Sequence, residues 1–254
     1  MAEAKQEFKF PTETVDLPSG GKVYSKDSPL SSGKIDVKYM TAKEEDILTS
    51  QNLIKKGVVV ETLIDSLIVT PGVKNADMVI GDKNAVMVAA RILAYGSDYE
   101  AEVTSPTTGE TVTHTFNLAD CPFKKIPKDV DTGQNEFTVK LPVSKAEVVF
   151  KVLYGRDETA IDKEIKSHQK LNVQVAPELT TRLKHSIISV DGDVEKGTIY
   201  NFVNSMLSKD SLFLRKEMVR VSPDIELRQE IEIGGEAVDV NIPLTVEFFW
   251  PKTN

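Results

Sequence analysis

The sequence predicts an α+β fold, because segments with helical spacing and segments with strand alternation occupy separate stretches of the chain. Three observations support this class. Apolar and polar residues alternate over 225–248, on both sides of a Gly-Gly pair. Thr41 has Glu44 three residues later, which is the spacing of a helical capping box. Residues 97–155 are rich in Thr and Val, a composition typical of paired strands.

Residues 1–96 are expected to form an N-terminal hairpin followed by helices. Apolar residues flank the Pro/Gly turn at 18–21, which predicts a short hairpin or extended corner. Residues 34–39 alternate charged and apolar side chains, as a half-buried strand does. Helices are predicted at 41–57, at 58–68, and after Asp82, which we expect to be the N-cap of a largely buried helix.

Residues 97–155 are expected to form a β-rich insert. A turn at 105–109 separates two Thr- and Val-rich runs and predicts a hairpin. Two further strands are predicted at 136–141 and 146–153.

Residues 156–254 are expected to form a C-terminal helical region that ends in a β-hairpin. Helices are predicted at 158–169, 177–188 and 199–207, and Asp210 is expected to cap a further one. The alternation over 225–248 predicts a long hairpin with one wet face and one apolar face. The chain is therefore expected to divide at about residues 96 and 155.

Composition limits the class of partner. The formal net charge is −8 and the Lys and Arg residues are scattered, which disfavours a nucleic-acid binder. No run reaches the ~18 apolar residues that a membrane span requires, and the first residues lack the apolar core of a signal peptide. A single cysteine, Cys121, excludes an internal disulfide. We therefore expect a chain made in a cytosol, with protein partners and without nucleic acid or a membrane span.

The residue types that carry chemistry show no catalytic or metal-binding spacing. His114, His168 and His185 lie far apart, without carboxylate or Cys at ligand spacing. Cys121 is expected to be a small buried apolar side chain. The sequence at 129–133 begins like a calcium loop, but its Gly stands at the fifth position where the sixth is required. We predict no catalytic, metal-binding or cofactor-binding residues and no cofactor.

Two further short patterns are expected to be turns. The Asp-Gly-Asp sequence at 191–193 is too short to define a cation site. Residues 19–22 lack the first glycine of a phosphate-binding loop, and Val23 stands where Ser or Thr would hold magnesium.

Surfaces for protein partners are the remaining candidates. Aromatic and apolar residues near the two ends of the chain suit contact with a neighbour's sheet or groove. The partner-contact candidates are Phe8, Phe10, Leu17, Tyr24 and Trp250. The alternative, that these segments complete the chain's own sheets, stays open.

Several motifs resemble those of a known family. They are TVDLPSGGKVY at 14–24, TAKEEDIL at 41–48, QNLIKKG at 51–57 and the closing FFWP at 248–251. In this order they resemble the baseplate hub proteins of T4-like contractile-tail phages. The likeness covers both ends of the chain, and the middle matches only in general character.

The resemblance implies a structural subunit of a phage tail baseplate, without enzymatic activity and made in the cytoplasm of the infected bacterium. Its partners would be other baseplate or tail proteins and further copies of itself. Members of this family are either hub subunits or hub assembly chaperones. A transient chaperone that is not retained in the virion is therefore the alternative.

Two functions from other classes also stay open. A hydrolase could use Asp191, Asp193 and His185, which are close in sequence, although no nucleophile or oxyanion donor is evident near them. A host-binding adaptor would need its aromatic side chains on one open surface. Those aromatic residues are Tyr99, Phe116 and Phe123.

Overall fold

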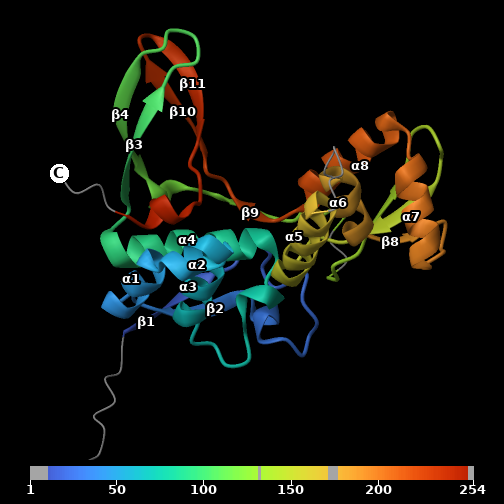
Figure 1. The fold of residues 1–254 in the computed structure, drawn as a ribbon, viewed down its shortest axis with the longest axis horizontal. Coiled ribbons are helices and arrows are strands. Elements are labelled where there is room, and N and C mark those ends of the chain that lie inside the picture. The colour runs from blue at the N-terminus through green and yellow to red at the C-terminus, as the bar shows by residue number, and fades with distance from the viewer. Residues whose placement is uncertain (1–10, 131–132, 171–176, 251–254) are drawn as a thin grey trace, which may run out of the picture.

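The computed structural model describes residues 11–130, 133–170 and 177–250. The fold is α+β, as the sequence predicts. Figure 1 shows three regions: a helical base, an upright arm of strands over one end of it, and a helical lobe at the other end.

The base is built by the first hundred residues. It consists of β1 (Thr12–Asp16), η1 (Pro29–Ser32), β2 (Lys34–Lys38), α1 (Ala42–Thr49), α2 (Gln51–Lys56), α3 (Val59–Leu67), η2 (Asn75–Asp77) and α4 (Ile80–Tyr95). Strands β1 and β2 pair antiparallel. The predicted helix at 41–57 is present as two helices, and the second ends at Gly57 with a positive φ of 68°.

The predicted capping box of α1 is confirmed. The backbone N–H and the hydroxyl of Thr41 donate to Glu44 Oε2 at 3.0 and 2.6 Å. Glu44 is fully buried, and Lys38 Nζ donates to its other oxygen at 2.8 Å. The carboxylate therefore begins the helix and also ties it to β2.

The predicted N-cap role of Asp82 is wrong. Helix α4 begins two residues earlier, after Val79, and Asp82 lies within its first turn. Its buried carboxylate accepts hydrogen bonds from Ser19 N at 2.9 Å, Ser19 Oγ at 2.6 Å and Tyr24 Oη at 2.7 Å. Asp82 thus fixes the Pro/Gly turn at 18–24 to α4 instead of capping the helix.

The arm combines two hairpins that are far apart in sequence. They are β3 (Asp98–Thr104) with β4 (Thr111–Asn117), and β10 (Arg228–Ile233) with β11 (Glu236–Asn241). The hairpins lie together in Figure 1, and a Cβ on Gly234 would stand 2.8 Å from Glu110 Oε2. Val103 and Val238 are each only 8% exposed, which a lone two-stranded hairpin in water would not achieve.

The C-terminal hairpin is shorter than predicted. Its Gly234-Gly235 turn is confirmed, with φ of 61° and 84°, as a two-residue hairpin turn requires. The strand ends at Asn241, however, and Val246–Phe249 forms the 3-10 helix η4. Pro243 has no backbone N–H to donate to a neighbouring strand. The apolar residues after it are therefore not part of the hairpin, and those of η4 are buried at the foot of the arm.

The lobe contains a small sheet covered by helices. It consists of β6 (Phe137–Lys140), β7 (Glu147–Phe150), α5 (Gly155–Lys170), α6 (Glu178–Ser186), β8 (Ile187–Val190), α7 (Lys196–Ser205) and α8 (Ser208–Val221). The sheet order is β6-β7-β8, with antiparallel pairs. The predicted helix at 177–188 stops at Ser186, because the two residues that follow belong to β8.

The predicted capping role of Asp210 is also wrong. Leu207 is the N-cap of α8, and Asp210 is buried in the first turn. Its carboxylate accepts from the backbone N–H groups of Val143 and Ser144 at 2.8 and 2.9 Å. It therefore binds α8 to the β6–β7 turn.

The strands of residues 97–155 lie in different regions of the molecule. The first pair is in the arm, β5 (Phe123–Lys124) follows η3 (Leu118–Asp120) and pairs with β9 (Asp224–Ile225), and the last pair is in the lobe. The division of the chain into three domains stays a prediction.

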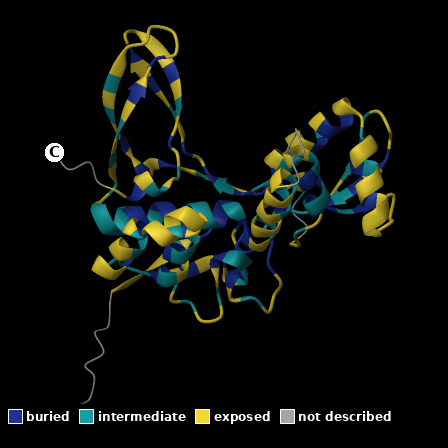
Figure 2. Cartoon of the chain, viewed as in Figure 1, coloured by how far each residue is buried: buried dark blue, intermediate teal, exposed yellow. Residues whose placement is uncertain are grey.

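Two glycines allow the base and the lobe to approach closely. A Cβ on Gly81 of α4 would lie 1.9 Å from the carbonyl oxygen of Pro223, and one on Gly155 would lie 2.6 Å from that of Asn75. Buried residues run from the base into both other regions (Figure 2), and they form one cluster. The three regions therefore share a core.

Acid is expected to destabilise this fold through two buried carboxylates. Burial alone would raise the pKa of Glu44, but the hydrogen bonds from Lys38 and Thr41 outweigh burial and lower this pKa. The pKa of Asp210 is lowered in the same way, because the backbone N–H groups of Val143 and Ser144 outweigh its burial. A lowered folded pKa contributes stability above the ordinary carboxyl pKa, and this stability is lost as pH falls through the folded value.

The test is urea unfolding at about pH 6 and about pH 3. We expect the double variant Glu44→Gln, Asp210→Asn to lose less stability on acidification than the wild type. Asp46→Asn, on an exposed position of α1, is the control and should keep the wild-type slope. Equal slopes in all three proteins would contradict the prediction.

Candidate functional site

The arm carries a strongly acidic surface. Residues 98–117 and 228–241 contain eight Asp and Glu side chains and a single Lys or Arg, which is Arg228. In the β10–β11 register, Glu230 lies directly opposite Asp239, and both are exposed. Like charges directly opposite on one face destabilise a hairpin. This surface therefore favours a cationic neighbour.

A buried arginine holds the foot of the arm. Arg91 of α4 is 3% exposed, and its guanidinium donates to the carbonyl oxygens of Phe248 at 3.2 Å, Gly96 at 3.1 Å and Asp98 at 3.4 Å. Burial lowers the pKa of Arg91. One side chain thus joins α4 to the start of β3 and to η4, so the arm is fixed to the base at two points of the chain.

The lobe presents a surface of opposite character along α8. Five side chains project from this helix at spacings of three, four and seven residues, which places them on one face. All five are exposed; they are Lys209, Leu212, Arg215, Lys216 and Val219. We call this set the α8 face. Leu212 is 46% exposed and Val219 is 66% exposed, so the face is both basic and apolar.

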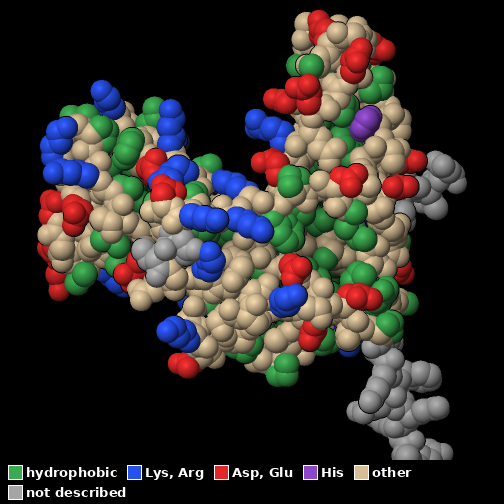
Figure 3. Space-filling view, turned by 180° about the vertical axis from the view of Figure 1, so that it is seen from behind, with side chains coloured by type: hydrophobic (Ala, Val, Ile, Leu, Met, Phe, Trp, Pro, Cys, Tyr) green, Lys and Arg blue, Asp and Glu red, His purple; other side chains and the backbone are tan. Residues whose placement is uncertain are grey.

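A groove adjoins the α8 face. Its volume is about 450 Å³, and its walls include Leu179 and Arg182 of α6 with Arg215 and Val219 of α8. Arg182 is paired with Glu158 at 2.6 Å, so Arg215 is the more available cation there. In the space-filling view of Figure 3, acidic side chains mark the arm and basic ones gather on the lobe and across the middle of the molecule.

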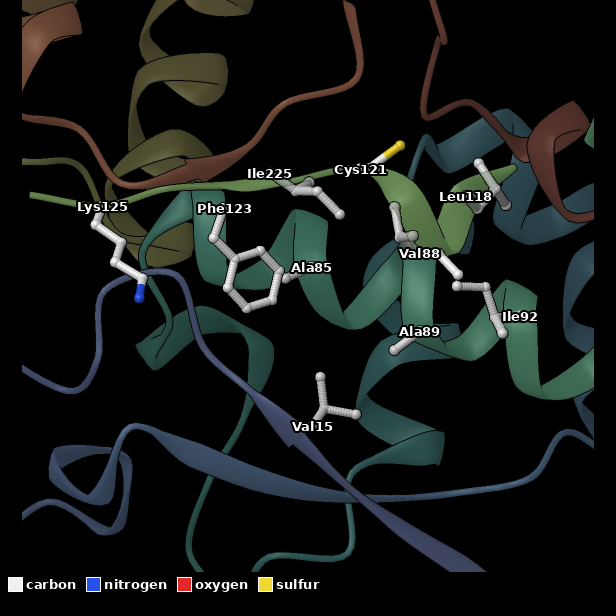
Figure 4. Close-up of a pocket in the computed structure, with 11 residues that line it drawn as sticks. Val15, Ala85, Val88, Ala89, Ile92, Leu118, Cys121, Phe123, Lys125 and Ile225 are labelled. Carbon is white, nitrogen blue, oxygen red and sulfur yellow. The ribbon is translucent and has the colours of Figure 1, made fainter. Parts of the chain in front are cut away.

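A second cavity lies between the base and the segment that leads out of the arm (Figure 4). It is about 540 Å³ and lined mainly by apolar side chains, with α4 along one wall, Val15 of β1 below and Phe123 of β5 above. Lys125 is the charged side chain in its wall. The Cys121 sulfur points away from α4 and accepts from Gln229 Nε2 at 3.4 Å, and burial raises the pKa of this thiol. The cavity suits an apolar group and offers no activated nucleophile.

The structure gives the residues of the hydrolase alternative hydrogen-bond partners other than one another. His185 Nε2 lies 3.1 Å from Glu164, the Asp191 carboxylate accepts from Glu147 N at 2.8 Å, and that of Asp193 accepts from Glu195 N at 2.8 Å. Each side chain thus has a different partner. Among the described residues, no group of three or more His, Cys, Asp or Glu is placed to hold a metal ion.

The other weak patterns of the sequence have structural partners. Ser19 belongs to the Asp82 network, and Asp129 is paired with Arg220 at 3.0 Å. The second acidic position of the calcium-like loop, Asp131, lies outside the described residues.

The aromatic residues of the adaptor alternative do not share an open surface. Phe116 is 1% exposed in the arm, Tyr99 packs on Phe248 with ring centroids 5.2 Å apart, and Phe123 lines the cavity of Figure 4. This condition of the adaptor hypothesis is therefore not met.

The partner-contact candidates lie in different environments. Leu17 and Tyr24 are 3% and 7% exposed and belong to the core of the base. Trp250 is 36% exposed at the end of the described chain. Phe8 and Phe10 lie outside the described residues. The contact role of all five stays a prediction.

Sequence reasoning missed the two charged surfaces. The alternation that predicted the β10–β11 hairpin already places Glu230 and Glu232 on its wet face, but the position of Asp239 opposite Glu230 depends on the register. The α8 face was missed because the sequence predicted a helix after Asp210 without any statement about the exposed side of that helix. The spacing of its exposed apolar residues was the available signal.

A molecule that presents an acidic arm at one end and a basic, apolar helix face at the other is suited to contact other proteins, and the described residues form no catalytic constellation that we can recognise. A family model described as T4 bacteriophage base plate protein matches residues 10–250, almost the whole chain, so the chain belongs to that family. Neither a curated protein nor a solved structure matches it.

The match confirms the T4-like baseplate family that the sequence motifs indicated, and with it a structural component of a phage baseplate. The narrower hub and chaperone assignments stay predictions. No helix in the described part of the chain is long and apolar enough to cross a membrane.

Proposed function

We propose that this chain is a non-catalytic structural subunit of the hub or central region of a contractile phage tail baseplate. It is made in the cytoplasm of the infected bacterium and assembles there through protein–protein contacts with other tail proteins. The family supports the baseplate setting. The observation that carries the structural role is the pair of charged surfaces at opposite ends of a molecule with one shared core.

The way these surfaces are built supports a permanent subunit over an enzyme. The hydrogen bonds of Arg91 fix the arm to α4, and those of Asp210 fix α8 to the sheet of the lobe. Both surfaces therefore rest on buried polar anchors, and a fixed spacing between them suits a part that holds neighbours in place. The alternative, an assembly chaperone, would use the same surfaces transiently.

Quantitative mass spectrometry of gradient-purified phage particles separates these roles. We expect the chain to be present at a fixed copy number relative to known baseplate proteins, and to co-purify with tails after a high-salt wash. The amount of an abundant host cytosolic protein in the same particles serves as the control for non-specific contamination. Absence from particles, together with abundance in the infected-cell lysate, would refute the structural role and establish the chaperone.

A further inference from the structure

We propose that the chain binds a second copy of itself head to tail, with the acidic outer face of the β10–β11 hairpin of one copy on the α8 face of the next. The outer face of the hairpin is defined by Glu230, Glu232 and Asp239. This proposal concerns the chain itself, and it holds whether the protein stays in the virion or leaves during assembly.

The hairpin has a reason to bind cations. Glu230 and Asp239 are exposed and directly opposite, and Glu232 follows two residues later on the same face. Arg228, opposite Asn241, is the one Lys or Arg of the arm and lies on this face two residues before Glu230, so three acidic side chains there stand against one basic one. Repulsion across the strands is relieved when basic side chains of another molecule approach.

The α8 face supplies those basic side chains on an apolar surface. Lys209, Arg215 and Lys216 are exposed cations, and Leu212 and Val219 lie between and beyond them. Exposed apolar side chains surrounded by polar ones are typical of a protein interaction site. The apolar pair gives area that becomes buried, and the cations select an acidic partner.

The two surfaces cannot meet within one chain. Figure 1 shows the arm rising from one end of the base and α8 in the lobe at the other end. The buried anchors at Arg91 and Asp210 hold each of them there. The contact is therefore between copies, and because it joins unlike surfaces it is heterologous: successive copies form a ring if the rotation closes, and a filament if it does not.

The experiment is sedimentation velocity of the purified full chain at about 50 mM and about 500 mM salt, because screening weakens contacts between exposed charges. We expect wild type to self-associate at low salt and to dissociate at high salt. The arm variant Glu230→Lys, Asp239→Lys and the face variant Arg215→Glu, Lys216→Glu should each raise the apparent dissociation constant by roughly tenfold or more. Unchanged thermal unfolding checks that each variant is folded.

Mixing the two variants gives the decisive result. The arm variant keeps an intact α8 face and the face variant keeps an intact arm, and their reversed arm and reversed face are also complementary. Their equimolar mixture should therefore restore the association that neither variant shows alone. A chain with all four substitutions should self-associate again, because both charges are reversed. The control Asp27→Lys, Asp46→Lys makes the same change in net charge as the arm variant, but on exposed positions of the base, and should behave as wild type.

Three outcomes would overturn the proposal. The first is a wild-type chain that stays monomeric at every concentration in low salt. The second is an arm or face variant that associates as strongly as wild type. The third is a mixture of the two variants in which association is not restored.

Discussion

Replacing Gly81 by Ala is expected to destabilise the chain strongly. The new Cβ would stand 1.9 Å from the Pro223 carbonyl oxygen and 2.6 Å from its carbon, and both are backbone atoms that cannot swing aside. Relief requires that the start of α4 and the segment before β9 move apart. We expect a loss of about 2–4 kcal/mol in unfolding free energy, as for overpacked cores.

Gly197 offers a matched control. It is the second residue of α7, as Gly81 is the second residue of α4, and a Cβ there would meet nothing within 4 Å. Gly197→Ala should therefore keep or raise stability, by up to about 1 kcal/mol, because Ala favours helix over Gly. Chemical denaturation measures both variants. Equal effects of the two substitutions would contradict the close packing of α4 on the Pro223 segment.

Asp82→Ala is expected to have a comparable effect for a different reason. The substitution leaves the buried N–H of Ser19 and the hydroxyls of Ser19 and Tyr24 without their acceptor. Removing one partner of a buried polar network costs about 3–5 kcal/mol when the other groups stay buried. Asp27→Ala, on an exposed position of the same loop region, should leave the denaturation midpoint unchanged.

The pH dependence of this effect has a defined sign. Burial raises the pKa of Asp82 above its ordinary value of 3.8, although hydrogen bonds from Ser19 and Tyr24 oppose the rise. A group with a raised folded pKa contributes stability below its ordinary pKa and loses that contribution as pH rises through the folded value. The unfolding free energy of wild type minus that of Asp82→Asn should therefore be largest at low pH. A difference that grows with increasing pH would contradict this assignment.

The features that the sequence predicted correctly are local. Thr41 and Glu44 are three residues apart, and the cap they form needs nothing from the rest of the chain except burial. The Gly-Gly turn of the C-terminal hairpin is decided by two residues that tolerate positive φ. Such signals can be read from spacing and residue type alone.

The features that were missed depend on distant partners. Asp82 and Asp210 have the residue type of helix caps, but each lies inside a first turn and binds backbone of another segment. The β8 strand continues the apolar spacing of α6, so only its pairing with β7 distinguishes it from helix. The acidic arm likewise depends on two hairpins meeting across more than a hundred residues.

The candidate contacts were predicted from residue type at the two ends of the chain, without knowledge of burial. Leu17 and Tyr24 flank a turn that looks exposed in sequence, but Asp82 holds that turn against α4. Charge pattern on the wet faces of regular elements was the better guide to the surfaces of this fold, because those side chains are exposed by the same periodicity that buries their neighbours.

Because the arm is built from two hairpins far apart in the sequence, the order of synthesis determines when it can fold. Its first hairpin leaves the ribosome more than a hundred residues before β10 and β11 do, and contacts of such long sequence separation form late in folding. Until then the apolar side of β3–β4, with Val103 and Phe116, has no cover from the second hairpin. A chain interrupted before residue 228 would therefore lack both the acidic hairpin and the shield for the first one. The part of the molecule that presents the acidic surface is thus completed last, and the proposed contact through it requires a finished chain.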